Sequence, residues 1–223
     1  MTASDRARRT FRGDRLLLAS TAEQIMAMAA QRTADRRWTE DEFYEARDAA
    51  PPGERWELVD GSVLVTPSPH WTHQRAVARL FVLLDAYVRR QQVGEAFFSP
   101  LDVKLEPGLV LQPDVLAVPN GELRRQSDIV RHLLLAVEMV SPSSARHDRV
   151  TKRPRYQRNR VPEYWIVDDK SQTIERWTPD DERPELLAEE LVWNPGGARD
   201  PLVLDLVKFF ADVAALPDDD ASE

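Results

Sequence analysis

The clearest periodic pattern in the chain lies between residues 71 and 91. Apolar side chains recur there at every third or fourth position, which is typical of a single apolar stripe along an α-helix. The members of the stripe are Val77, Leu80, Phe81, Leu84, Tyr87 and Val88. The pattern predicts a long amphipathic helix over residues 71–91 that is ended by Gly94.

Short apolar segments bounded by proline or glycine predict strands on both sides of this helix. The segment WELVDGSVLVTPSP predicts two short strands that meet at Asp60-Gly61, a dipeptide typical of tight hairpins. Residues 132–140 are apolar almost throughout, as expected for a strand that is covered on both faces. Further strands are predicted within residues 95–107, 113–119, 161–168 and 172–179, with edge strands in 185–193 and 201–206.

Three shorter helices complete the predicted domain. Thr39 and Glu42 have the spacing of a capping box, so a helix of two to three turns is expected to follow. Residues 146–160 are expected to be mainly helical, and 205–213 predict a closing amphipathic helix. Strands that alternate with helices predict a single α/β domain over residues 38–215.

The two ends of the chain are expected to lie outside this domain. Residues 1–37 begin with arginines, but their apolar run is too short for a secretory signal peptide. We therefore expect an extension, which a translation start at Met26 or Met28 would largely remove. Residues 216–223 are expected to form a disordered acidic tail, and the protein is expected to be cytoplasmic.

The amino-acid composition excludes several kinds of functional site but adds little about the fold. The 223 residues include no cysteine, which excludes disulfides, thiol nucleophiles and thiolate metal sites. The apolar runs are too short to span a bilayer, so no membrane association is expected. A net charge of −8 argues against a protein coated in nucleic acid, but it remains compatible with a local basic site.

The first chemical signal is a pair of carboxylates in apolar surroundings. Glu138 lies inside an apolar strand, and Asp114 opens another strand directly after a proline. A buried carboxylate costs several kcal/mol unless a metal or a partner compensates it. Two carboxylates at adjacent strand ends suit Mg²⁺, which prefers oxygen ligands. The alternative for Asp114 is that it caps a local turn.

The second signal lies in the basic segment 146–160. The four-residue spacing of Asp148, Lys152 and Tyr156 predicts that they share one helical face. An ammonium beside a metal-bound water could orient that water or stabilise developing phosphorane charge. The arginines around it could contact phosphates, although a solvated helix face is the alternative. These arginines are Arg146, Arg149, Arg153, Arg155, Arg158 and Arg160.

Five segments of the chain share their residues and their order with one known family. They are WELVDGSVLVTPSPHWTHQRAVARL, SPLDVKL, QPDVLAV, VEMVSPSS with the following DRVTKRPRYQ, and VPEYWIVD. These segments, which span about 38–212, resemble the Uma-two family of restriction endonucleases in the PD-(D/E)XK nuclease superfamily. The resemblance implies an α/β fold with a restriction-endonuclease-like core, in which helices flank a mixed central β-sheet. An extra β-hairpin or strand region is expected on the C-terminal side.

The resemblance also implies which residues bind metal. Asp114 matches the aspartate of the QPD motif and Glu138 matches the second acid, so both would hold Mg²⁺, with Mn²⁺ as a substitute. The carbonyl of Met139 would help them. Glu57 matches an upstream acid that would bind a second metal or tune the site, although an ordinary exposed strand position is the alternative.

One position departs from the superfamily pattern. Val140 stands two residues after the second acid, where the superfamily places a lysine. Lys152 is the match in this family and would orient the attacking water, although a solvated helix face is its alternative. Pro154 would break a helix that already runs from Asp148, but it is tolerated in the first turn of a helix that begins near Lys152.

Several residues are weaker candidates. His70 and His73 are expected to make local hydrogen bonds, although His73 is close enough to the helix start to face the site. Tyr156 is expected to pack or to hydrogen bond rather than to react. The secondary site candidates are His73, Gln112, Asp148 and Tyr156, and the candidate DNA contacts are Arg149, Arg153, Arg155 and Arg158.

The resulting expectation is a Mg²⁺-dependent endonuclease that hydrolyses DNA phosphodiester bonds, with a homodimer suited to double-strand cleavage. One alternative is a catalytically inactive module that binds nucleic acid or assembles while retaining the nuclease fold. Another is a metal-dependent hydrolase of a small phosphate ester.

Overall fold

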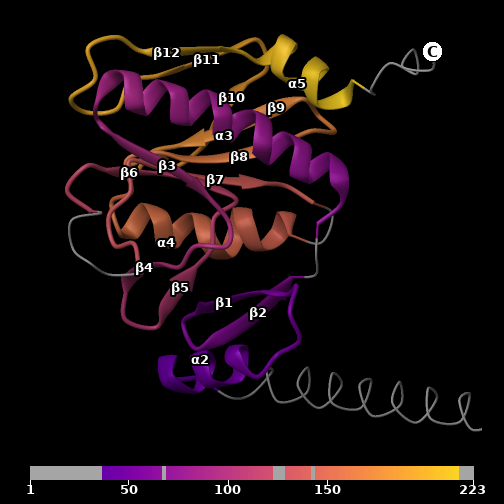
Figure 1. Ribbon diagram of the computed structural model, residues 1–223, viewed down its shortest axis with the longest axis vertical. Coiled ribbons are helices and arrows are strands. Elements are labelled where there is room, and N and C mark those ends of the chain that lie inside the picture. Colours follow the sequence, from indigo (N-terminus) through magenta and orange to yellow (C-terminus); the bar gives the residue numbers. More distant parts are fainter. Residues whose placement is uncertain (1–36, 67–68, 123–128, 142–143, 216–223) are drawn as a thin grey trace, which may run out of the picture.

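The centre of the molecule is a six-stranded mixed β-sheet, seen in the computed structural model in Figure 1. The structure describes residues 37–66, 69–122, 129–141 and 144–215, so the predictions for 1–36 and 216–223 lie outside the described residues. The strand order is β10-β9-β8-β7-β6-β3, in which β7 and β8 are parallel and the other neighbours antiparallel. The strands are β3 (Gly94–Phe98), β6 (Val115–Pro119), β7 (Leu135–Met139), β8 (Tyr164–Asp168), β9 (Thr173–Trp177) and β10 (Glu185–Leu187).

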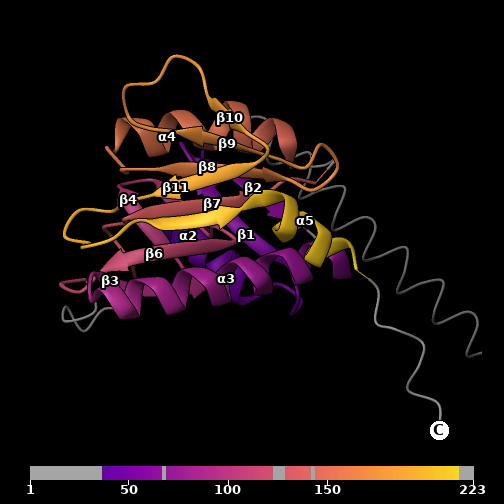
Figure 2. The same ribbon diagram turned by 90° about the horizontal axis from the view of Figure 1, so that it is seen from above.

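Helices cover both faces of this sheet, which confirms the predicted layers. The helix α3 (Trp71–Gln91) packs on one face together with α5 (Leu206–Ala214). The other face meets a helical segment made of η2 (His147–Lys152) and α4 (Arg153–Arg158). Figure 1 shows the strands of this sheet between α3 and α4, and Figure 2 shows the same arrangement from above.

The alternation along β7 determines where the site forms. Leu135, Val137 and Met139 join the core beneath α3, whereas Ala136 joins the core on the opposite face. Because side chains alternate along a strand, Glu138 points with Ala136 toward η2 and α4. The whole strand is buried, as its sequence predicts.

A second sheet lies on the same side as α4. Its order is β2-β1-β5-β4. The strands are β1 (Arg55–Val59), β2 (Ser62–Thr66), β4 (Val103–Glu106) and β5 (Leu109–Leu111). Asp60 and Gly61 both have positive φ at the turn between β1 and β2, which confirms the predicted hairpin. The helix α2 (Glu40–Asp48) begins at the predicted capping box and buries Phe43 against this sheet.

The sequence predicted that Gly94 ends α3, and this prediction is wrong. The helix ends at Gln91 and is capped by Gln92, which takes the left-handed conformation with φ 57°. Gly94 instead opens β3, where a β-carbon would lie only 1.9 Å from the carbonyl oxygen of Val118. A glycine is therefore required there by the close approach of two strands.

The remaining predicted strands are distributed over three different sheets. The segment 95–107 divides between β3 of the main sheet and β4 of the second sheet. Among the described strands, β10 is an edge of the main sheet, but β11 (Glu190–Trp193) and β12 (Leu202–Asp205) pair with each other as a separate ribbon. This ribbon packs on the α3 side and forms the expected C-terminal strand region.

The basic segment is helical before Pro154 as well as after it. The backbone N–H of Arg153 donates to the carbonyl of Asp148, five residues earlier, in the wider geometry of a π-helix. This change of register just before the proline lets the helix continue through Pro154, which then lies in the first turn of α4. A helix that begins only near Lys152 is therefore not what forms.

None of the helices in the described part of the chain is both long enough and apolar enough to cross a membrane.

Candidate active site

Two buried carboxylates meet where neighbouring strands of the main sheet end. Asp114 directly precedes β6, and Glu138 lies in β7, which pairs with β6 through Val115 and Val137. The backbone N–H of Met139 donates to Oδ2 of Asp114 at 2.7 Å. Asp114 is therefore anchored to the neighbouring strand, and both acids are at most 2% exposed.

Glu57 approaches the same point from the second sheet. It is the third residue of β1, and its Oε1 accepts a hydrogen bond of 2.8 Å from the backbone N–H of Gln112. Glu57 is 1% exposed, so an ordinary exposed strand position is ruled out. The side chain of Gln112 donates instead to Asp102, which also accepts from Arg47, so Gln112 serves the site through its backbone.

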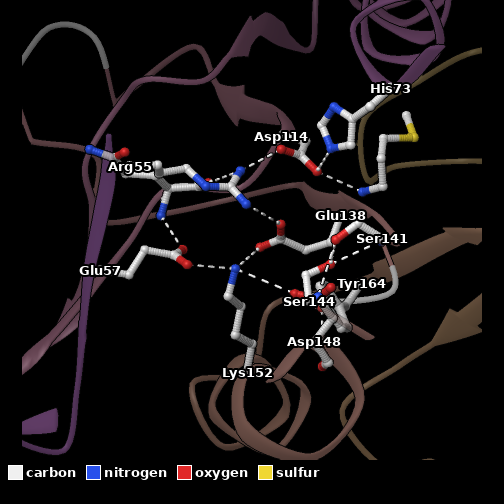
Figure 3. Close-up of polar contacts among 12 residues, drawn as sticks. Arg55, Glu57, His73, Asp114, Glu138, Ser141, Ser144, Asp148, Lys152 and Tyr164 are labelled. Atoms are coloured by element: carbon white, nitrogen blue, oxygen red, sulfur yellow. Dashed lines mark hydrogen bonds and ion pairs between the residues drawn. The ribbon is translucent and has the colours of Figure 1, made fainter. Parts of the chain in front are cut away.

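Lys152 joins these carboxylates from η2 (Figure 3). Its Nζ lies 2.7 Å from Oε2 of Glu57, 2.9 Å from Oε1 of Glu138 and 3.4 Å from Oδ1 of Asp148. The lysine is 2% exposed, which rules out a solvated helix face. A lysine from the following helix thus reaches the second acid even though Val140 occupies the usual position in the strand.

Arg55 is a member of the cluster that the sequence did not reveal. Its Nη1 pairs with Oδ1 of Asp114 and donates to the carbonyl of Gln112 at 3.3 Å. Its Nη2 lies 4.0 Å from Oε2 of Glu138. The available signal was its position two residues before Glu57, because alternate residues of a strand share one face.

The two histidines at the start of α3 have different roles. His70 caps the helix, and its Nδ1 lies 3.1 Å from Oγ1 of Thr72, which is the expected local contact. His73 faces the site, with Nε2 3.2 Å from Oδ2 of Asp114. It therefore orients this carboxylate together with the backbone of Met139.

Asp148 and Tyr156 extend the cluster on the helix side. Asp148 is 1% exposed and shares the buried ion-pair network of Lys152. The ring of Tyr156 stacks on Tyr164 with 4.5 Å between centroids, and the Tyr164 hydroxyl donates to the carbonyl of Asp148. Tyr156 is thus a packing residue, as expected.

The electrostatics of the cluster leave an excess of negative charge. Among the described residues it contains four carboxylates and two permanent cations, Arg55 and Lys152. Burial would raise the pKa of Asp114, but the hydrogen bond from His73 and the charge of Arg55 outweigh it and lower the pKa to about 2. Burial raises the pKa of Glu138 well above its usual range despite the attraction of Lys152. The charge of Lys152 therefore does not fully offset the cost of burying an ionised Glu138.

The donor set fits a hard divalent cation in chemistry and in charge. Carboxylate oxygens are the preferred ligands of Mg²⁺, and a dication would balance the excess charge. Among the described residues, Oε2 of Glu57 is buried without a hydrogen-bond partner, and its ion-pair contact is Nζ of Lys152 at 2.7 Å. Within the described ranges, no three Asp, Glu or His side chains lie close enough together to bind one metal ion. The carboxylates that would bind it are paired with Arg55 and Lys152 instead.

The arginines of the basic segment pair mainly within the chain. Arg149 binds Glu175 and Asp168, and Arg153 lies 4.4 Å from the ring centre of Trp177. Arg155 and Arg158 reach carboxylates of the second sheet: Asp60 for both, and Glu106 for Arg158. None of these four arginines lines the cavities described next, and their contact with DNA stays a prediction.

Two cavities give access to the cluster. The larger, about 580 Å³, lies at the start of α3 and the end of β7, and its wall includes His73, Asp114 and Met139. The smaller, about 190 Å³, reaches Glu57, Asp148 and Lys152 from the side of the β1–β2 hairpin. Arg55 lines both cavities, so it lies between Asp114 in the wall of the larger one and Glu57 in the wall of the smaller one.

Comparison with known proteins supports this reading of the fold. A crystal structure described as "a putative nuclease belonging to DUF820" from Anabaena variabilis superposes with a TM-score of 0.68. The match has 20% sequence identity and covers 79% of this chain and 99% of the other. The comparison with curated proteins gave no match. Residues 41–206 match the family Uma2, described as "Putative restriction endonuclease", and the chain therefore belongs to this nuclease family.

Proposed function

We propose that this protein is a metal-dependent endonuclease that hydrolyses DNA phosphodiester bonds, with Mg²⁺ as its metal and Mn²⁺ as a substitute. The observation that carries the proposal is a buried cluster in which Lys152 contacts three carboxylates and Arg55 pairs with a fourth, Asp114, beside an open cavity. Membership of a nuclease family supports the reaction class. A network of this kind has no structural need for so many buried acids, because apolar residues would fill the same space at lower cost.

In this proposal Asp114 and Glu138 hold the metal, helped by the Met139 carbonyl, and Glu57 binds a second cation or tunes the first. A bound Mg²⁺ would neutralise charge on the scissile phosphate and lower the pKa of a bound water. His73 and the Met139 N–H keep Asp114 in place by occupying Oδ2.

Lys152 acts as a hydrogen-bond donor rather than as a base. Burial would lower its pKa, but Glu138, Glu57 and Asp148 together raise it above its ordinary value. The ammonium therefore stays charged at neutral pH. It can orient the attacking water and stabilise the charge that develops on the phosphate.

Binding of DNA is assigned to the arginines of η2 and α4. Arg158 is the most exposed, with 54% of its side chain accessible, and its carboxylate partners are themselves partly exposed. A DNA phosphate can replace such partners at low cost, because exposed ion pairs contribute little stability. The candidate contacts are Arg149, Arg153, Arg155 and Arg158. A homodimer would place two such sites on the two strands of a duplex.

The test is cleavage of supercoiled plasmid and of single-stranded DNA in Mg²⁺, Mn²⁺ or EDTA. The parent is compared with Glu138→Gln and with the matched control Glu163→Gln, which removes a half-buried carboxylate paired with Trp165 outside the cluster. We expect metal-dependent nicking by the parent and the control, and at least a hundredfold loss in Glu138→Gln.

Four results would contradict the proposal. Nicking at an equal rate in EDTA would remove the metal from the reaction, and full activity of Glu138→Gln would misplace the site. Metal-dependent hydrolysis of nucleotides without cleavage of DNA would favour a small phosphate ester as substrate. Salt-sensitive DNA binding without any cleavage would favour a binding module that retains the nuclease fold.

A further inference from the structure

Arg55 pairs with the oxygen atom of Asp114 that would have to bind a metal, which is Oδ1. Oδ2 of Asp114 already accepts from the Met139 N–H at 2.7 Å and lies 3.2 Å from Nε2 of His73. A carboxylate oxygen has two lone pairs, so Oδ2 is saturated and only Oδ1 remains. Nη1 of Arg55 pairs with that Oδ1, while Nη2 faces Glu138.

The same guanidinium stands at the boundary of the larger cavity. Arg55 lines this cavity, although its side chain is only 17% exposed. Of the described residues in the cavity wall, Arg55 and the exposed Lys170 are those with permanent positive charge. A phosphodiester that enters the cavity therefore meets one guanidinium close to the acids, and guanidinium binds phosphate through two parallel hydrogen bonds.

We propose that Arg55 is a resident counter-ion that a divalent cation displaces from Asp114 and Glu138, and that the released guanidinium then binds the phosphodiester in the larger cavity. The inference rests on the proposed function for its metal. Displacement follows from charge, since a dication at Oδ1 repels Arg55 and supplies the acids with twice the charge that they lose.

The first test measures Mn²⁺ affinity by calorimetry in the absence of DNA. Arg55→Gln removes the competing charge, so we expect it to bind Mn²⁺ at least tenfold more tightly than the parent. Asp114→Asn should bind more weakly. Arg176→Gln is the matched control: this arginine is 23% exposed and pairs with Glu185 in β9 and β10, and its loss should leave Mn²⁺ affinity unchanged.

The second test measures binding of a short DNA duplex in Ca²⁺, which should occupy the site without supporting cleavage. We expect Arg55→Gln to bind the duplex at least tenfold more weakly than the parent, although a larger fraction of the variant has a bound cation. A structural role alone would not produce tighter metal binding together with weaker DNA binding. Unchanged or weaker Mn²⁺ affinity, or unchanged DNA affinity, in Arg55→Gln would overturn the inference.

The outcomes separate this inference from the proposed function. If Asp114→Asn binds Mn²⁺ as the parent does, the proposed metal site itself is wrong. If Asp114→Asn weakens binding but Arg55→Gln does not tighten it, only the role of Arg55 fails. If Arg55→Gln does not fold, the parent is titrated with Mg²⁺ and followed by NMR. The signal of the Arg55 Nε–Hε group, identified by its loss in Arg55→Lys, should then shift. An unmoved signal would refute displacement.

Discussion

Replacing Lys152 by methionine removes a charge that three buried carboxylates share. Nζ lies 2.7, 2.9 and 3.4 Å from oxygens of Glu57, Glu138 and Asp148, and all four side chains are at most 2% exposed. Methionine keeps most of the length and volume of the side chain. Because removal of one partner leaves uncompensated buried charge, we expect the free energy of unfolding to fall by about 3–5 kcal/mol at pH 7.5 in EDTA.

The loss of stability should depend on pH in a defined direction. Burial raises the pKa of Glu138, and Lys152 opposes that rise, so the pKa rises further in the variant. A carboxyl whose pKa is higher in the folded than in the unfolded state takes up a proton on folding, and stability then increases as pH falls through the folded pKa. The deficit of Lys152→Met should therefore shrink between pH 7.5 and pH 5. The parent keeps its ammonium throughout, because the pKa of Lys152 is raised.

The assay is urea unfolding followed by tryptophan fluorescence, since Trp165 and Trp193 are buried in the main core. Lys208→Met is the matched control, because Lys208 forms an exposed ion pair with Asp212 at 2.7 Å. Its loss should change stability by less than about 0.5 kcal/mol. The reasoning is refuted if Lys152→Met lies within about 1 kcal/mol of the parent at pH 7.5, or if its deficit grows at pH 5.

Two further substitutions test the packing around the site. Gly94→Ala places a β-carbon 1.9 Å from a backbone carbonyl of β6 and should destabilise by more than about 3 kcal/mol, whereas Gly121→Ala, with open space, should be near neutral in the same unfolding assay. Tyr164→Phe loses a buried hydrogen bond to a carbonyl of η2 and should cost about 0.5–1.5 kcal/mol. Tyr156→Phe removes a buried hydroxyl that has no partner in the described structure and should cost less; equal losses would contradict both assignments.

Local patterns in the sequence predicted the features that depend on neighbouring residues. The apolar stripe gave α3 its full extent, and the capping box at Thr39 and the Asp60-Gly61 turn formed as expected. The acids were also accessible, because Glu138 interrupts an apolar strand and Asp114 opens another. A carboxylate in an apolar strand can be recognised in the sequence, although the residue that compensates its charge cannot.

The role of Arg55 could not be predicted because it depends on contacts between distant segments. Arg55 meets Asp114 only because β1 pairs with β5, and the chain then passes through Gln112 into β6. The alternation in β1 contained a partial signal, since Trp56 and Leu58 face the α2 side and leave Arg55 and Glu57 on the other face. The sequence marks that face as charged, but the partners come from the tertiary fold.

The helix around Lys152 shows the same limit in the backbone. Proline rules allow Pro154 in a helix that begins near Lys152 but not in one that already runs from Asp148, because they assume α-helical hydrogen bonding throughout. The π-helical turn from His147 to Lys152 instead shifts the hydrogen bonding by one residue and carries the helix through Pro154. This turn contains Asp148 and Lys152, whose buried partners Glu57 and Glu138 lie in distant strands and are not visible in local periodicity.

Anomalous scattering from Mn²⁺-soaked crystals would locate the metal and show whether the acids paired with Arg55 bind it. We expect a manganese peak bound by Asp114 and Glu138, with the guanidinium of Arg55 withdrawn from Oδ1 of Asp114. A manganese peak elsewhere, or an intact pair between Arg55 and Asp114 at saturating Mn²⁺, would refute both the proposed metal site and the displacement of Arg55.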